Sequence, residues 1–332
     1  MEEKVTSFEE MKEMIAEIVE KMKKKGGIKN VYCLACGGSH ACLYPMEYFL
    51  RTEAKNIAVH SITSNEFVYA MPKAVDENTL VFAMSLMGGT KETVEAAKAA
   101  KAAGATVVAL CAKHEVPLVE PADYTVIYRI DIGYPVEEQN QMKILTLAVE
   151  LLNQTEGYVN YDAMLDGYDK IGEICTKAIR QVKDRAIEFG RDYKDEPVLY
   201  TMASGASSKV AYMQSICMFM EMEWVHSSSI HCGEFFHGPF EVTDYETPFM
   251  IFMGEGRTRY LDERALKFLR TYAKKVIVID AKELGLDTIS DEVIEYFNPI
   301  LHWAVGLEYA EGLAQAKKHP IFMRRYMYKV EY

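Results

Sequence analysis

Short apolar runs alternate along the chain with stretches in which apolar residues recur every three or four positions. The runs predict buried strands, and the recurring pattern predicts amphipathic helices. In the first half, helices are expected at residues 5–25, 39–52, 90–104 and 141–155, and strands within residues 30–38, 55–64, 78–90, 105–112 and 123–130. Strands that alternate with helices favour an α/β fold, with a parallel sheet and helices on both faces.

The second half of the chain repeats the first at a constant offset of 168 residues, which pairs Ala35 with Ala203. The same offset relates the members of several other identical pairs: Gly37 and Gly205, Ser39 and Ser207, Glu66 and Glu234, Gly88 and Gly256, and Thr90 and Thr258. The copies differ where chemistry would lie, because Ser85 corresponds to Met253 and His237 corresponds to Tyr69. We therefore expect one duplicated α/β unit and one composite site that uses residues of both copies.

This pattern divides the chain into four segments. Residues 1–27 are expected to form an N-terminal helix and residues 28–157 a first α/β domain. A charged helical connector follows at 158–194, and a second α/β domain occupies 195–332. The tail from residue 298 is expected to begin as a helix and to end as an extended arm.

Composition narrows the class of protein. The 332 residues carry a formal net charge of -12, which argues against a nucleic-acid partner, since that would require a basic surface. Local loops and helix N-termini can still bind an anionic small molecule. The sequence has no apolar run long enough to span a membrane and no signal-peptide core, and its seven cysteines have no disulfide framework pattern. A cytoplasmic protein with reduced thiols is expected.

Two glycine-containing turns follow expected strands. The segment from Ser85 to Thr90 (SLMGGT) places hydroxyls and backbone N–H groups at a helix N-terminus, where a dianion is favoured. The segment 35–39 (ACGGS) is a second such turn, at the end of another parallel strand. The alternative for the first segment is a tight turn with Thr90 as an N-cap. Neither is a Walker A loop, and the GxGxxG pattern of nicotinamide-binding proteins is absent.

The segment from Glu221 to Glu241 concentrates carboxylates and three histidines. Glu221 lies late in an apolar helix and is a candidate general base. His237 lies in a loop beside glycine and proline and is a candidate acid, whereas His226 and His231 are interpreted as structural.

Two metal sites and one hydrolase site are alternatives for these residues. The spacings of His226, His231 and His237 place no pair on one helix face, and HExxH is absent. Cys33 and Cys36 form a single C-x2-C with no second pair. The serines at 227–229 lack the G-x-S-x-G elbow of serine hydrolases. No metal is expected.

The duplicated unit, the ACGGS turn, the S-x-x-G-x-T loop and the EFFHGP segment resemble proteins with two sugar-isomerase (SIS) domains, over residues 31–332. The chain resembles the isomerase half of glutamine–fructose-6-phosphate amidotransferase, and more closely the fructosamine-6-phosphate deglycases. MEMEW, IHCGEFFHGPFE and the ending RRYMYKVEY carry the closer resemblance. This resemblance implies two flavodoxin-like units, each with a five-stranded parallel sheet. It also implies that the chains form a homodimer or higher homo-oligomer.

The resemblance also implies roles for individual residues. Glu221 matches the general base, and His237 matches the ring-opening or acid histidine, which in this family is often delivered across the subunit interface. The resemblance further implies residues that bind the substrate, among which Ser85 and Thr90 hold the sugar phosphate. The expected substrate-binding set is Cys36, Gly37, Gly38, Ser39, Glu66, Ser85, Gly88, Gly89, Thr90 and Tyr134.

Departures from the amidotransferase favour deglycation over ammonia transfer. Leu86 and Met87 stand where that family has further hydroxyls and a glutamine, so backbone groups must do more of the phosphate binding. Arg325 falls nearest the Schiff-base lysine, and arginine cannot form that imine. The glutaminase domain and its N-terminal cysteine are expected to be absent.

The function expected from the resemblance is cleavage of a 6-phosphorylated fructosamine with water to glucose 6-phosphate and an amine. Such proton abstraction beside a carbonyl needs no cofactor. An aldose–ketose phosphosugar isomerase and a non-catalytic phosphosugar sensor remain alternatives. The amine is expected to lie against residues 134–139 and the C-terminal arm, where Glu137 and Glu138 either meet a cationic group or are simply solvated.

Overall fold

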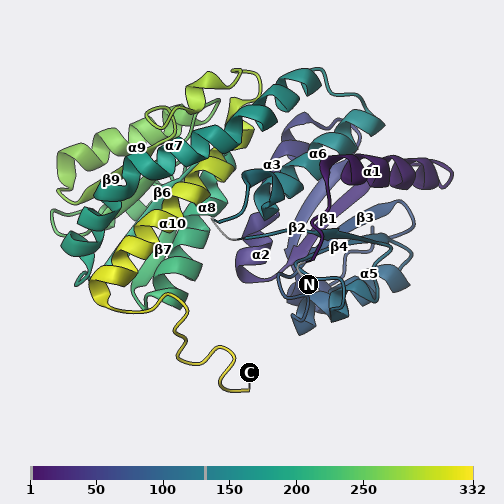
Figure 1. Ribbon diagram of the computed structural model, residues 1–332, viewed down its shortest axis with the longest axis horizontal. Helices are drawn as coiled ribbons and strands as arrows, with labels where there is room; N and C mark the ends of the chain where they lie inside the picture. Colours follow the sequence, from purple (N-terminus) through teal and green to yellow (C-terminus); the bar gives the residue numbers. More distant parts are fainter. Residues whose placement is uncertain (1–2, 131–132, 332) are drawn as a thin grey trace. The chain divides into compact units, whose positions relative to one another are not determined.

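The computed structural model describes residues 3–130 and 133–331, which form two compact units, 1–162 and 163–332. Each unit is built around a parallel sheet with helices packed on it (Figure 1). The α/β class expected from the alternating pattern is confirmed. The four-segment division of the chain remains a prediction. Within the described residues, no helix is both long and apolar enough to cross a bilayer.

Unit 1 contains a five-stranded parallel sheet, in the order β2-β1-β3-β4-β5. The strands are β1 (Asn30–Ala35), β2 (Ala58–Thr63), β3 (Thr79–Met84), β4 (Thr106–Cys111) and β5 (Tyr124–Ile127). Every residue of the central strand β3 is buried, which explains its unbroken apolar run. Both neighbours of β1 are in register with it, since Asn30 is paired with Ala58 on one side and with Thr79 on the other.

The helices of unit 1 are α1 (Phe8–Lys23), α2 (Gly37–Cys42), α3 (Tyr44–Glu53), α4 (Ser64–Tyr69), α5 (Lys91–Ala102) and α6 (Asn140–Thr155). One apolar cluster joins strand residues such as Val81 and Val107 to Phe67 of α4 and Ala97 of α5. Both α1 and α3 pack against α6. A reciprocal capping box between Ser7 and Glu10 begins α1, two of whose four orphan N–H groups are thereby satisfied.

Unit 2 has a four-stranded parallel sheet in the order β7-β6-β8-β9 within its described residues. The strands are β6 (Val198–Ala203), β7 (His226–His231), β8 (Phe249–Met253) and β9 (Val276–Asp280). The expectation of five strands in this unit was wrong. After β9 the acidic segment 286–297 forms only short 3-10 turns and leads directly into a helix, so no fifth strand is added.

The helices of unit 2 are α7 (Tyr161–Tyr193), α8 (Ser208–Met213), a π-helix (Gln214–Met222), α9 (Arg259–Tyr272) and α10 (Asn298–Lys317). Glycines allow α7 and α10 to approach closely, because a Cβ on Gly190 would lie 2.0 Å from the carbonyl oxygen of Gly312. Beyond α10 the chain continues as an arm without helix or strand, residues 318–331, which is formed largely of turns and bends.

Candidate active site

The first predicted loop connects β3 to α5. Ser85 is buried, and its Oγ lies 2.9 Å from Oγ1 of Thr90. The backbone N–H of Thr90 also donates to Ser85 Oγ, at 3.4 Å. Thr90 occupies the N-cap position of α5, as predicted, but its side chain pairs with Ser85 and caps no N–H of the helix. The loop therefore places two neighbouring hydroxyls in front of a helix N-terminus, where an anion is favoured.

Gly88 fixes the shape of this loop. Its φ is +63°, and a Cβ there would lie 2.1 Å from a methyl group of Val116. Its carbonyl accepts a hydrogen bond from Leu118 N at 3.0 Å, which ties the loop to the segment after β4. Gly89 is exposed, and a Cβ there would be in ordinary contact with the carbonyl oxygen of Met87, at 3.9 Å. Only glycine fits at 88, because both the backbone angle and the available space exclude a side chain.

The second predicted loop follows β1, the strand next to β3. Cys36 is extended and half-buried, and it precedes the first turn of α2. Gly37 has a φ of +55° with no other atom close to where a Cβ would be, and Gly38 and Ser39 are partly exposed. Because β1 and β3 are adjacent and parallel, both loops lie at the carboxyl edge of the sheet, where open α/β sheets bind ligands.

Two further predicted residues of unit 1 lie outside these two loops. Glu66 is exposed in α4, which follows β2 and packs against α5, so it lies at the same edge of the sheet. Ser64 of α4 donates to Oγ1 of Thr93 in α5 at 3.1 Å. Tyr134 instead follows β5, two strands beyond β3, where its ring faces the Arg129 guanidinium at 5.2 Å.

Glu221 lies in the last turn of the π-helix. Glu223 N donates to Met218 O, five residues back, and Trp224 ends the helix with a φ of +54°, in the left-handed region usually occupied by glycine. The predicted helix is therefore present, but its second half has π geometry that the apolar pattern could not reveal. Single π turns recur at functional sites in proteins.

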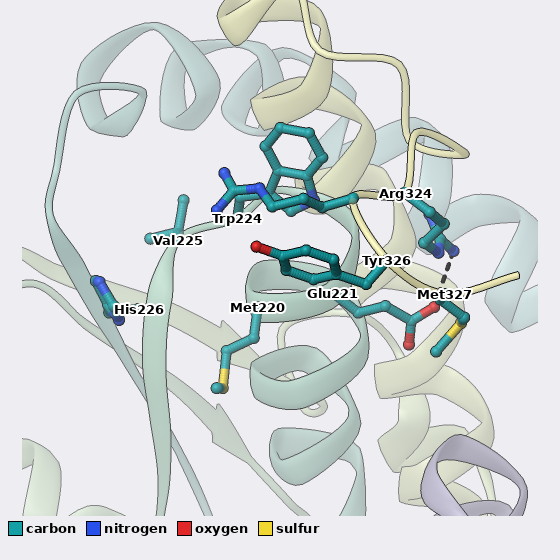
Figure 2. Close-up of a pocket in the computed structure, with 9 residues that line it drawn as sticks. Met220, Glu221, Trp224, Val225, His226, Arg324, Tyr326 and Met327 are labelled. Carbon is teal, nitrogen blue, oxygen red and sulfur yellow. Dashed lines mark ion pairs between the residues drawn. The ribbon is translucent and has the colours of Figure 1, made fainter. Parts of the chain in front are cut away.

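Glu221 lines a pocket of about 450 Å³ between the end of the π-helix and the C-terminal arm (Figure 2). Its carboxylate forms an ion pair with Arg324, with 2.9 Å between Oε1 and Nη2. The remaining lining residues are Met220, Trp224, Val225, His226, Arg325, Tyr326 and Met327. The arm was predicted to line the amine pocket, whereas Arg324 as the partner of Glu221 was missed; the only signal was a pair of arginines in an apolar tail.

The other glutamate of MEMEW has a different environment. Glu223 is buried, and neither of its carboxylate oxygens has a hydrogen-bond partner. Burial raises the pKa of this carboxyl to about 7. Glu221, in contrast, has a quarter of its side chain exposed and opens into the pocket. Of the two, Glu221 is the one placed to meet a substrate.

His237 lies outside this pocket. It is exposed on the turn after β7, and Gly238, which follows it, has a φ of +127°. His226 begins β7 and lines the pocket beside Glu221, so the whole of β7 separates Glu221 from His237. Six strand residues span roughly 17 Å or more. Within one chain, the two predicted catalytic residues are therefore not brought together.

The remaining histidines and cysteines do not converge. His231 ends β7, and its Nδ1 accepts from Gly233 N at 3.1 Å, which is a structural contact. Burial raises the pKa of the Cys33 thiol, as expected of a neutral core residue. Among the described residues there is no group of three His, Cys, Asp or Glu side chains suited to a metal ion.

In unit 2, the turn that corresponds to ACGGS is filled by side chains of the same unit. Ser207, which corresponds to Ser39, is buried, and its hydroxyl lies 2.7 Å from Nδ1 of His302. Burial lowers the pKa of His302 to about 4, so this imidazole is neutral near pH 7. A Cβ on Gly205 would lie 2.2 Å from the hydroxyl of Thr258. The first glycine turn is thus open at Gly37 of unit 1, whereas its counterpart at Gly205 of unit 2 is filled.

A parallel α/β unit with hydroxyl-bearing glycine loops at its carboxyl edge agrees with the SIS resemblance of the sequence. The family model of the SIS domain matches residues 27–155. Fructosamine deglycase FrlB of Bacillus subtilis is 39% identical over 92% of this chain and 93% of its own length. Fructoselysine 6-phosphate deglycase of Escherichia coli is 26% identical over 82% of this chain and 78% of its own.

Solved structures agree with this. A Salmonella typhimurium protein assigned as a phosphosugar isomerase superposes with a TM-score of 0.92 at 42% identity, over 97% of this chain and 99% of that one. The C-terminal domain of the Francisella tularensis glucosamine-fructose-6-phosphate aminotransferase shares the fold, with a TM-score of 0.78 at 14% identity over 95% of each chain. The chain belongs to the SIS-domain family that includes the fructosamine deglycases, and it is an enzyme of that type.

Proposed function

We propose that this enzyme cleaves a fructosamine 6-phosphate, such as fructoselysine 6-phosphate, with water to give glucose 6-phosphate and a free amino acid or amine. The main support is the 39% identity to a fructosamine deglycase over 92% of the chain. The position of Glu221 is independent support, because a partly exposed carboxylate that opens into a pocket can act as a base.

The chemistry follows from the bonds that must change. His237 assists opening of the sugar ring, which frees the C2 carbonyl. Glu221 removes a proton from C1 to give an enaminol, and a proton returned to C2 gives an imine at C1. Water adds to that imine, and its C–N bond breaks to release the amine and leave the C1 aldehyde of glucose 6-phosphate. No step changes the oxidation state of the system as a whole, so acid–base groups suffice.

We assign phosphate binding to the loops of unit 1. The hydroxyls of Ser85, Thr90 and Ser39 are hydrogen-bond donors that suit a dianion. Gly37, Gly38, Gly88 and Gly89 allow the backbone to approach it. We also assign substrate contacts to Cys36, Glu66 and Tyr134. Glu66 shares the carboxyl edge with the loops, whereas Tyr134 follows β5.

We propose that His237 acts on a substrate bound to a second copy of the chain, in a homodimer or higher homo-oligomer in the cytoplasm. The support is geometric: His237 is exposed, and within one chain it lies at the opposite end of β7 from Glu221. A histidine on an exposed turn, followed by Gly238 and Pro239, is suited to reach a partner subunit.

A phosphosugar isomerase is the second candidate, and the 42% identical Salmonella typhimurium protein supports it. One coupled assay separates the two. The enzyme is incubated with fructoselysine 6-phosphate or with fructose 6-phosphate, and glucose 6-phosphate is detected with its dehydrogenase. Deglycation predicts product from the amine-bearing substrate. Product from fructose 6-phosphate alone would reject deglycation in favour of isomerisation.

A further inference from the structure

The C-terminal arm holds the π-helix at two neighbouring points. Arg324 forms the ion pair with Glu221, and the guanidinium of Arg325 stacks on the indole of Trp224 at 4.3 Å. The ring of His319 packs edge-on against the same indole. Two consecutive arm residues therefore contact Glu221, in the last turn of the π-helix, and Trp224, just beyond the end of that helix.

The Arg324 guanidinium is held firmly from the arm side. Its Nη1 donates to the carbonyls of Ile321 and Met323, at 2.8 and 3.0 Å. Its own carbonyl accepts from Lys329 Nζ at 2.5 Å. Only 13% of the Arg324 side chain is exposed. A partly buried guanidinium fixed by two carbonyls has little rotational freedom, so its remaining N–H groups point in a set direction.

We propose that Arg324 is a positioning residue for Glu221. It binds Oε1 and thereby orients the carboxylate so that Oε2 faces the substrate proton. This inference rests on the proposed function, since it assigns Glu221 as the base. Figure 2 shows the ion pair at the edge of the pocket, on the arm side of Glu221. A base held in one rotamer avoids the loss of rate caused by misplacement of about 1 Å.

A residue that positions the base predicts a different kinetic effect from a residue that only binds the substrate. A residue that orients the base affects the proton-transfer step and leaves ground-state binding nearly unchanged. Removing the guanidinium should therefore lower kcat more than it raises KM. Lysine restores the charge, but it lacks the planar guanidinium that binds two carbonyls and a carboxylate at the same time. Arg324→Lys should therefore restore only part of kcat.

The test compares Arg324→Met and Arg324→Lys with wild type, using the substrate that wild type cleaves. We expect Arg324→Met to lower kcat at least about tenfold, with KM changed less than about threefold, and Arg324→Lys to recover part of the loss. Combining Arg324→Met with Glu221→Gln should cost no more than Glu221→Gln alone. Arg191→Met is the matched control, because it breaks an exposed pair with Asp192 and should leave both constants unchanged.

Three results would overturn the proposal: a raised KM with unchanged kcat, an effect additive with Glu221→Gln, or wild-type kinetics. Thermal melts of each variant show whether the fold is intact. If wild type cleaves no fructosamine 6-phosphate, the proposed function fails by itself. Arg324 is then tested through exchange of the C1 proton of fructose 6-phosphate in D2O, which needs the same base. Exchange at the wild-type rate in Arg324→Met, or none in wild type, would contradict the role of Arg324.

Discussion

The hydroxyls of Ser85 and Thr90 lie 2.9 Å apart, before the N-terminus of α5, and the hydroxyl of Ser85 also accepts from the backbone N–H of Thr90. One hydroxyl donates its only proton to the other here, so both can donate to a phosphate once this bond opens, and the loop already places them at one point. The counterpart of Ser85 in the second unit is Met253, which offers no such donor.

Ser85→Ala and Thr90→Val should each weaken phosphate binding. Each removes a donor to a charged group, and such hydrogen bonds contribute about 1.5–3 kcal/mol. We expect KM to rise roughly tenfold or more in steady-state assays while the melting temperature changes little. Thr176→Ala is the control, since this exposed threonine of α7 bonds only to its own helix, at Gly172 O. Equal effects of all three substitutions would remove the two hydroxyls from phosphate binding.

Gly88→Ala should disrupt the loop more severely than any other glycine substitution near it. The added Cβ would meet Val116 at 2.1 Å, and the φ of +63° disfavours any L side chain. We expect loss of both activity and about 1–3 kcal/mol of stability, measured by denaturant unfolding. Gly37→Ala has the strained φ without the clash and should cost less.

Gly172→Ala provides the matched control for these substitutions. It lies in helix α7 with open space around it, so alanine should stabilise by up to about 1 kcal/mol. If Gly88→Ala behaved like Gly172→Ala, the loop geometry described for Gly88 would be incorrect.

Mixing two inactive variants tests whether His237 acts across a subunit interface. Glu221→Gln and His237→Asn should each be inactive alone, whereas refolding them together should restore part of the activity. The reason is that a mixed dimer contains one site with both an intact Glu221 and an intact His237. Restored coupled-assay rates of up to about a quarter of wild type are expected from statistical mixing. Mass spectrometry shows whether the subunits have exchanged. If mixed dimers form and the mixture stays inactive, both residues act within one chain.

The buried carboxyl of Glu223 makes stability depend on pH. Its pKa is raised to about 7, so between pH 4.5 and 7 the folded state binds more protons than the unfolded state. Stability therefore falls as pH rises through this window. Glu223→Gln should be more stable than wild type by about 1–3 kcal/mol at pH 8 and nearly equal at pH 4. Denaturant melts measure this, with the exposed Glu13→Gln as control. A pH-independent difference would contradict it.

Much of the fold could be read from the sequence, because strand, glycine turn and helix succeed one another with clear periods. Ser85, Gly88 and Thr90 lie where the pattern predicted, between a buried strand and an amphipathic helix. Periodicity describes neighbours along the chain only. It could not reveal the missing fifth strand of unit 2 or the π geometry at Glu221, since both depend on how distant segments pack.

The partner of Glu221 illustrates the same limit. Arg324 lies far along the chain, in a segment without helix or strand, and only the folded arm brings it to the π-helix. The two glutamates of MEMEW also look equivalent in sequence. Their separation into a buried Glu223 and a pocket-lining Glu221 follows from the π turn and the left-handed Trp224.

The most direct test of the proposed reaction follows the carbon that loses its proton. Fructoselysine 6-phosphate labelled with ¹³C at C1 is incubated with wild type and with Glu221→Gln, and the products are identified by NMR. Our account predicts that wild type places the label at C1 of glucose 6-phosphate, with an equal amount of free lysine, and that Glu221→Gln forms neither. Label in the C1 hydroxymethyl group of fructose 6-phosphate, or full activity of Glu221→Gln, would contradict it.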